Sequence, residues 1–380
     1  MEETVSENLN AVLVFADIYS ELKNNEFTLF FQEEKALFAL QKIEETELAN
    51  LAENISINPM YKLRFKVAKP NPTTLIGKGQ LEKLANLIEE NGIGIAVFNN
   101  DLSPRVQRNL EEALNICVID RREVIIQIFA DRAKTKEAVL QSKLAEFEYS
   151  MPRLTRKWAG LSQQRGGVKR SRGAGEKKME LDKRRLRTEI TKLKKEIEKV
   201  KTQRAIQRKS RIQSDKKIGA IVGYTNAGKS SLLKKLSGTE IFTEDKLFAT
   251  LDAETRKIYL PDGSKILLTD TVGFVSNLPH QLIDSFRSTL EEAALADFLI
   301  IVCDASHPAM HQCLSVTEKI LQELNCTQKE KIILINKADC IFDHAEVFKI
   351  KDRFPDALEI SVKTGKGIDS VKEKLLTLCR

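Results

Sequence analysis

Residues 223–230 read GYTNAGKS and lie between an apolar run, IGAIV (218–222), and a segment with helical spacing, SLLKKL (231–236). A G-x-x-x-x-G-K-S pattern between a strand and a helix is typical of a phosphate-binding loop; a coincidental glycine-rich turn is the weaker alternative. Backbone N–H groups of such a loop and of the helix that follows attract phosphate. We expect Lys229 to neutralise the β- and γ-phosphates of a nucleotide and the Ser230 hydroxyl to coordinate Mg²⁺. The residues expected to contact the nucleotide here are Gly223, Tyr224, Thr225, Asn226, Ala227, Gly228, Lys229, Ser230 and Ser231.

Further motifs follow later apolar runs and complete the phosphate and metal site. KILLTD (265–270) is followed by TVG, which places Asp270 in the outer shell of the Mg²⁺ and the N–H of Gly273 near the γ-phosphate. Thr250, in the loop LFATLDAET (247–255), is expected to be a Mg²⁺ ligand that switches with the nucleotide. We therefore expect Lys229, Thr250 and Gly273 to act on the γ-phosphate during hydrolysis.

The base is expected to lie against Asn336, Lys337 and Asp339, which follow the apolar run KIILI (331–335). An aspartate can accept both N–H donors of guanine, whereas adenine would leave it buried and unpaired. Ser361, Val362 and Lys363 follow another strand-like run and are placed to close over the base. In this order, at strand ends, the motifs predict a Ras-like GTPase domain over residues 217–380.

Phe274 follows Gly273 at the position where Ras-type enzymes have a water-orienting glutamine. A phenylalanine cannot hydrogen-bond a water, so we expect slow hydrolysis that needs a partner or a cation. The loop resembles that of potassium-activated GTPases, and on that resemblance we expect K⁺ to bind with Asn226 as a ligand.

The chain before residue 217 divides into two segments with different patterns. Residues 1–135 alternate strand-like runs with helical segments, which predicts a small α/β domain with a mostly parallel sheet. Residues 136–216 carry two seams of apolar residues at helical spacing, joined by the glycine-rich stretch 160–176. We expect an antiparallel coiled-coil hairpin, with Pro152 kinking the first helix or marking a helix start nearby. The first seam comprises Leu140, Leu144, Phe147, Met151, Leu154, Trp158 and Leu161, and the second Leu186, Ile190, Leu193, Ile197 and Val200.

Positive charge is concentrated in this hairpin. The net charge of +7 combines −7 over residues 1–150, +17 over 151–217 and −3 over 218–380. Such a field favours a polyanionic partner, although charge runs on coiled coils are often only solvated faces. At the expected tip, Arg165, Lys169, Arg170 and Arg172 accompany glycines that allow close approach to phosphate, so we favour contact with structured RNA.

The composition argues against several other classes of protein. No apolar run is long enough to cross a bilayer, and the N-terminus MEETVSENLN lacks the layout of a secretory signal, so we expect a cytoplasmic protein without a membrane span. Cys303, His307, His311 and Cys313 have the side chains of a zinc site. Because Cys303 belongs to a strand that should be buried, we favour structural or solvent-exposed roles for these residues.

The chain resembles the HflX family of ribosome-associated GTPases over nearly its whole length. The resemblance rests on DLSPRVQRNLEEAL (101–114), VIDR (118–121), MPRLT (151–155), the loop GG…RGAGE (166–176), LFATLDAETRK (247–257) and DTVGFVSNLPHQLIDSFRSTLEE (270–292). It implies binding to the large (50S) ribosomal subunit and its 23S rRNA, splitting of stalled or idle ribosomes with GTP bound, and hydrolysis stimulated by the ribosome. The loop reads RGAGEKKMELD where the family commonly has GET-x-LE, and the chain ends one helix after Lys363, so we expect no further small C-terminal domain.

Two other functions stay open at this stage. The protein could bind rRNA as a ribosome-assembly factor without splitting ribosomes, or it could be an RNA-binding scaffold with a structural nucleotide. A complete set of switch residues is unnecessary for a scaffold, which favours the GTPase functions but does not separate splitting from assembly. A monomer is the expected state.

Overall fold

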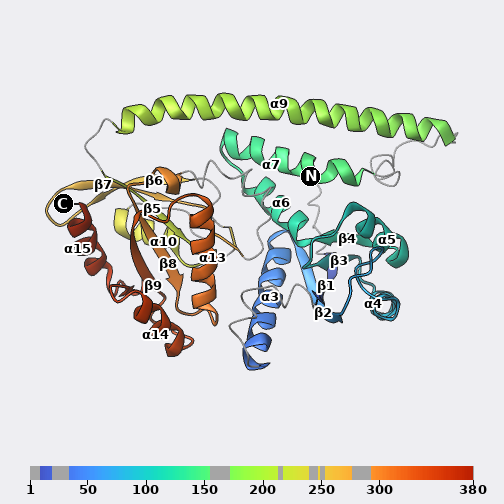
Figure 1. The fold of residues 1–380 in the computed structure, drawn as a ribbon, viewed down its shortest axis with the longest axis horizontal. Coiled ribbons are helices and arrows are strands. Elements are labelled where there is room, and N and C mark those ends of the chain that lie inside the picture. The colour runs from blue at the N-terminus through green and yellow to red at the C-terminus, as the bar shows by residue number, and fades with distance from the viewer. Residues whose placement is uncertain are drawn as a thin grey trace, which may run out of the picture.

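The computed structural model describes residues 9–18, 34–154, 172–212, 217–238, 247–248, 253–275 and 292–379. It contains two α/β domains, and a helical hairpin lies along both of them (Figure 1). The predicted mixed α/β class is confirmed.

The N-terminal domain is a four-stranded parallel sheet in the order β2-β1-β3-β4. Its strands are β1 (Leu9–Ile18), β2 (Ile57–Val67), β3 (Ile95–Phe98) and β4 (Cys117–Asp120), and its helices are α3 (Glu34–Asn54), α4 (Lys78–Asn91), α5 (Pro104–Leu114) and α6 (Arg121–Arg132). Alternate residues of β1 point to opposite faces. Leu13 packs in a core with α3 and α6, while Val14 packs in a second core with α4 and α5.

Strand β2 begins at Ile57 and includes Pro59. A proline removes a backbone donor and is tolerated mainly at sheet edges and bulges. β2 lies at the edge of the sheet, and its pairing with β1 shifts register between Ala11 and Val12, opposite Pro59. These two features explain how the strand accommodates the proline.

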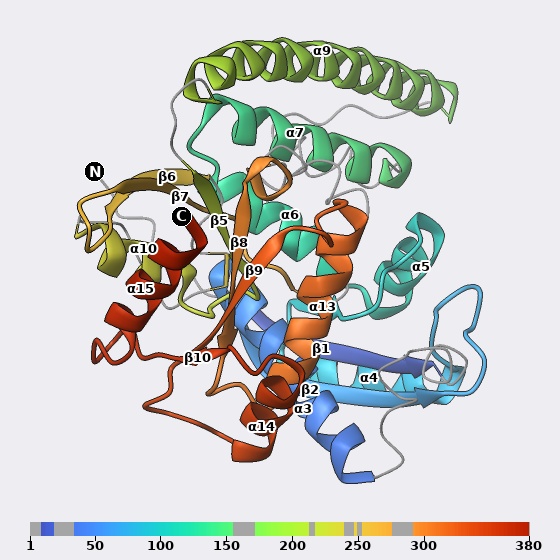
Figure 2. The same cartoon turned by 60° about the vertical axis from the view of Figure 1, so that its left-hand side comes forward.

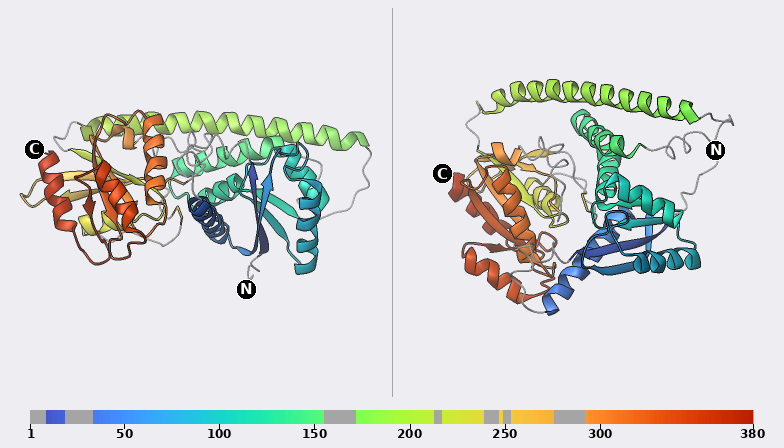
Figure 3. Two further views of the ribbon diagram at one scale, coloured as in Figure 1. Left: turned by 60° about the horizontal axis from the view of Figure 1, so that its bottom comes forward. Right: turned by 45° about the vertical axis from the view of Figure 1, so that its right-hand side comes forward.

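The hairpin consists of α7 (Lys136–Ser150), the 3₁₀ turn η1 (Met151–Arg153) and α9 (Arg172–Ile212). Glu148, near the end of α7, pairs with Lys194 at 2.8 Å, and the two helices run antiparallel (Figure 3). Residues of both predicted seams form one apolar core. Its members are Leu140, Leu144, Phe147, Met151, Ile190, Leu193, Ile197 and Val200.

The structure differs from the expected hairpin at two points. The first helix ends at Ser150, and Pro152 marks the start of the short 3₁₀ helix that follows, which is one of the two roles expected for this proline. Leu154 is therefore outside the helix, and Trp158 and Leu161 lie outside the described residues. Helix α9 already begins at Arg172, inside the segment expected to be loop. Glycines disfavour a helix, but extending a helix that already exists avoids the cost of a new nucleus.

The C-terminal domain has a six-stranded sheet in the order β10-β9-β8-β5-β7-β6, in which only the β6–β7 pair is antiparallel. Its strands are β5 (Ile218–Gly223), β6 (Glu254–Tyr259), β7 (Lys265–Asp270), β8 (Phe298–Asp304), β9 (Glu330–Asn336) and β10 (Leu358–Glu359), and its helices are α10 (Lys229–Ser237), α13 (Met310–Glu323), α14 (His344–Arg353) and α15 (Ile368–Cys379). Helices α13 and α14 share one core with the sheet, and α10 and α15 share the other. This is the predicted Ras-like architecture.

The two α/β domains meet through a continuous apolar core. Phe129 of α6 packs against Phe248, with ring centroids 4.8 Å apart, and both belong to the cluster that includes Val272 and Val275. Figure 2 shows α3 and α6 facing the C-terminal domain. Among the described helices, none has the length and apolar character needed to span a membrane.

Candidate nucleotide-binding site

The loop 224–228 connects the central strand β5 to α10, as the sequence predicts. Gly223 has φ +149°, and a Cβ there would lie 2.3 Å from the carbonyl oxygen of Val302. Gly228 has φ +91°, and a Cβ there would lie 2.4 Å from Nδ2 of Asn336. Both positions therefore require glycine because of backbone conformation and close packing.

Lys229, the first residue of α10, is buried beneath this loop. Its ammonium donates a hydrogen bond to the carbonyl oxygen of Tyr224 at 2.9 Å. Burial lowers the pKa of Lys229 to about 8, against the opposite effect of the nearby Asp270 carboxylate. An incoming phosphate would stabilise the charged form of this lysine.

Ser230 and Asp270 bring two oxygen ligands together beside Lys229. The Ser230 hydroxyl donates to Oδ2 of Asp270 at 2.5 Å, and Asp270 ends β7 next to β5. Hydroxyl and carboxylate oxygens are ligands that Mg²⁺ prefers, so these residues fit a magnesium site. At Gly273 a Cβ would lie 2.9 Å from Nζ of Lys229, so a side chain would crowd the lysine.

The predicted base site is assembled from the ends of β9 and β10. Ser361 donates to Oδ1 of Asp339 at 2.6 Å, and this hydrogen bond lowers the pKa of the Asp339 carboxyl. Asn336 donates to the carbonyl oxygen of Ala227 at 2.9 Å and accepts from the N–H of Val362 at 3.2 Å. Asn336 therefore ties the phosphate loop to the base loop, while Asp339 stays ionised and exposed.

Lys337 and Lys363 differ in their surroundings. Lys337 has φ +61°, and its ammonium pairs with Oδ2 of Asp304 at 2.7 Å. This ion pair fixes the lysine at the end of β8. Lys363 is exposed at the edge of the site.

Comparison with known proteins identifies the family of this chain. Family models described as GTP-binding GTPase N-terminal, GTP-binding GTPase Middle Region and 50S ribosome-binding GTPase match residues 42–130, 132–211 and 219–337. The GTPase HflX of Treponema denticola is 65% identical over 380 residues, which cover 98% of this chain and 97% of that protein. The chain belongs to the HflX family of GTPases.

Two further proteins illustrate the range of similarity. The GTPase HflX of Akkermansia muciniphila is 48% identical over 302 residues, which cover 78% of this chain and 69% of that protein. Among solved structures, a GTP-binding protein from the hyperthermophilic archaeon Sulfolobus solfataricus in complex with GDP is 24% identical, with a TM-score of 0.46 and coverage of 98% and 99% of the two chains.

Several predicted site residues of this HflX-family chain are not described. Thr250, Arg165, Lys169 and Arg170 lie outside the described residues, and Arg172 is the first residue of α9, with no description of its side chain. Asn226 is exposed in the phosphate loop with φ +62°. Phe274 is buried in the core beneath α13, so its ring points away from solvent.

The cysteine–histidine segment lies beside the phosphate loop. Cys303 is buried, and the sulfur of Cys313 lies 3.5 Å from Nδ1 of His307. Burial raises the pKa of Cys313 and lowers that of His307. Within the described ranges, no group of three or more metal-binding side chains is found.

Sequence reasoning missed the residues of the N-terminal domain that contact the site. The Tyr224 hydroxyl donates to Oε1 of Glu47 at 3.0 Å, and Glu47 pairs with Arg121 at 2.9 Å. Arg132 donates to the carbonyl oxygen of Phe248 at 3.1 Å. The contacts of Glu47 with Tyr224 and of Arg132 with Phe248 join positions more than 100 residues apart, and no local sequence motif indicates them.

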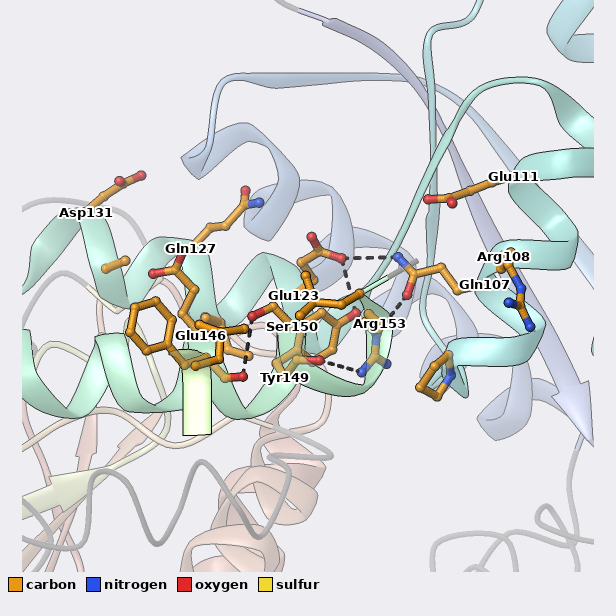
Figure 4. A pocket seen from close by; sticks show the side chains of 16 residues that line it. Gln107, Arg108, Glu111, Glu123, Gln127, Asp131, Glu146, Tyr149, Ser150 and Arg153 are labelled. Atoms are coloured by element: carbon orange, nitrogen blue, oxygen red, sulfur yellow. Dashed lines mark hydrogen bonds between the residues drawn. The ribbon is translucent and has the colours of Figure 1, made fainter. Parts of the chain in front are cut away.

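A cavity of about 510 Å³ lies apart from the nucleotide site, between α5, α6, α7, η1 and α9 (Figure 4). On its wall, Tyr149 donates to Oε2 of Glu123 at 3.1 Å and Arg153 donates to Oε1 of Gln107 at 2.8 Å. Burial, together with the nearby Asp120 carboxylate, raises the pKa of Glu123 to about 7. All lining residues fall between positions 104 and 186, so the cavity is no part of the GTP site.

Proposed function

We propose that this GTPase binds the large ribosomal subunit and its 23S rRNA, and that in the GTP state it splits stalled or idle ribosomes. The observation that carries the proposal is the match of residues 219–337 to a family described as 50S ribosome-binding GTPases. The basic face of α9 supports it. Its described exposed basic residues are Arg184, Arg185, Arg187, Lys192, Lys194, Lys195 and Lys199.

In this proposal Lys229 neutralises the β- and γ-phosphates, and Gly273 presents its N–H to the γ-phosphate. Ser230 and Thr250 would be direct ligands of Mg²⁺, with Asp270 in its outer shell; bound there, the metal would screen phosphate charge. Asp339 and Asn336 bind guanine, with Lys337 and residues 361–363 around it. Asn226 would hold K⁺, whose charge would serve in place of the water-orienting glutamine that Ras-type enzymes have where this chain has Phe274.

In this proposal the nucleotide controls the conformation of two loops, and this change drives the splitting of ribosomes. GTP orders the loops carrying Thr250 and Gly273, and hydrolysis releases them. The tip residues Arg165, Lys169, Arg170 and Arg172 contact rRNA, and the protein acts as a cytoplasmic monomer. We propose that the N-terminal domain spans residues 1–135, the helical hairpin 136–216 and the GTPase domain 217–380.

The decisive measurement is the rate of GTP hydrolysis in KCl and in NaCl, with and without purified large subunits. We expect a low rate alone, a higher rate in KCl, and a large stimulation by the subunits. Lys229→Ala is the control for contaminating GTPases and should abolish turnover. A fast rate without stimulation would contradict the ribosome dependence.

Sucrose-gradient profiles separate splitting from the alternative role in ribosome assembly. With saturating protein and a non-hydrolysable GTP analogue, splitting converts the 70S peak into subunits. An intact 70S peak would reject splitting and favour an rRNA-binding maturation factor.

A further inference from the structure

We infer that Glu47 of the N-terminal domain is a positioning residue for GTP hydrolysis, acting through Tyr224 of the phosphate loop. Oε1 of Glu47 accepts a hydrogen bond from the Tyr224 hydroxyl at 3.0 Å and pairs with Nη2 of Arg121 at 2.9 Å. Tyr224 and Glu47 are each 7% exposed and Arg121 is 3% exposed. A charged hydrogen bond in such a dry setting holds its partners in one geometry.

The N-terminal domain presents Glu47 on a fixed support. Arg121 begins α6 directly after β4, and its Nη1 donates to Oδ1 of Asn99, just beyond β3, at 3.0 Å. The same guanidinium therefore joins the carboxyl ends of β3 and β4 to helix α3 through Glu47. The position of the Tyr224 hydroxyl is set by this sheet rather than by the GTPase domain alone.

The backbone of Tyr224 and of its neighbours contacts the phosphate site, so the position of Tyr224 affects the position of that site. Its carbonyl oxygen accepts the hydrogen bond of the Lys229 ammonium at 2.9 Å. On either side of Tyr224, the N–H of Thr225 donates to the carbonyl of Phe274 at 2.7 Å, and the N–H of Phe274 donates to the carbonyl of Gly223 at 3.1 Å. A shift of Tyr224 would move both Lys229 and the backbone adjoining Gly273.

A second contact of the N-terminal domain reaches the other loop expected to act on the γ-phosphate. Arg132 of α6 donates to the carbonyl oxygen of Phe248 at 3.1 Å and to Oδ1 of Asn54 at 3.2 Å. Phe248 lies two positions before Thr250 in the sequence. The N-terminal domain thus contacts both the phosphate loop and the segment leading into Thr250.

Simple packing does not account for the polar part of this contact. A phenylalanine would fill the same space at position 224, and a buried hydroxyl costs free energy unless it is hydrogen-bonded. Packing alone predicts that losing the hydroxyl changes stability but not the turnover of folded protein. Positioning predicts a loss of kcat with little change in KM, because small misplacements of a reacting group cost rate.

The test compares kcat and KM for GTP of the full-length chain with those of Tyr224→Phe, Glu47→Gln and the double variant, each corrected for the folded fraction. We expect kcat to fall about ten-fold in each single variant, with KM changed less than about three-fold. Because both substitutions break one interaction, the double variant should be no slower than the slower single variant.

Tyr61→Phe is the matched control, since the Tyr61 hydroxyl also donates to a side chain, Oδ1 of Asn91 at 2.6 Å, but away from the GTPase domain. Its kcat should stay at the wild-type value. Wild-type kcat in Tyr224→Phe would overturn the inference, as would an equal loss of kcat in Tyr61→Phe. If Glu47→Gln does not fold, the comparison of the two Tyr→Phe variants still decides the matter.

Discussion

Glu123 is a carboxylate whose surroundings favour its neutral form. It lies on α6 at the wall of the cavity, and burial is the main cause of its raised pKa of about 7. The folded protein therefore holds this proton more tightly than the unfolded chain, where the pKa is 4.5. Stability contributed by the protonated group is complete below pH 4.5 and is lost as the pH rises through 7.

Glu123→Gln should remove this loss, because the amide stays neutral and keeps an oxygen that can accept from Tyr149. We expect the variant to match the wild type near pH 5 and to be more stable by about 1–3 kcal/mol at pH 8. The measurement is the difference in Tm between variant and wild type at both pH values. Glu146→Gln, at an exposed carboxylate of the same cavity, is the control. A Tm difference that does not grow between pH 5 and pH 8 would contradict the prediction.

At the scale of elements, the long helix α9 depends on α7 for its packing. With 41 residues it is about 60 Å long. Among the side chains of α9 that the structure describes, at positions 180–200 and 202, only Ile190, Leu193 and Ile197 are buried, and they form a short apolar stripe. An isolated stripe of this kind gains its stability from the partner helix rather than from helix propensity. Loss of a central side chain should therefore loosen both helices together.

Leu193→Ala should cost about 2–4 kcal/mol, because the side chain is 9% exposed and its removal leaves a cavity between the helices. Hydrogen exchange should show lower protection in both α7 and α9. Leu181→Ala on the same helix is the control, since Leu181 is 54% exposed and its loss should cost less than about 0.5 kcal/mol. Equal effects of the two substitutions would show that the stripe does not hold the hairpin.

Features that depend on local backbone structure could be predicted from the sequence. The spacing of apolar residues predicts that the two seams pair, and motifs at strand ends predict the site residues Asp270, Asn336 and Asp339, because the neighbouring strand positions each of them. The contact of Glu47 with Tyr224 spans 177 positions. On α3, Glu47 is one of several acidic residues, and only the docking of the two domains makes it different from Glu44 and Glu45.

At the scale of the whole molecule, the basic helix α9 runs along both α/β domains (Figure 1). The segment 151–217 has a net charge of +17, while the chain before and after it is acidic. A polyanion is therefore attracted to one side of the molecule. The N-terminus of this helix, at Arg172, adjoins the glycine-rich stretch proposed to contact rRNA.

Arg170→Ala combined with Arg172→Ala should weaken binding to large subunits and make it less dependent on salt. Each lost phosphate contact lowers the slope of log K against log salt by about 0.7–0.9. Affinities measured from 50 to 300 mM KCl should therefore give a slope reduced by about 1–2. Lys372→Ala with Lys374→Ala removes the same charge from α15 and is the matched control, for which the slope should stay constant. An unchanged slope in the arginine variant would mean that the tip charges are only solvated. A slope reduced equally in both variants would show that net charge, rather than contact at the tip, sets the salt dependence.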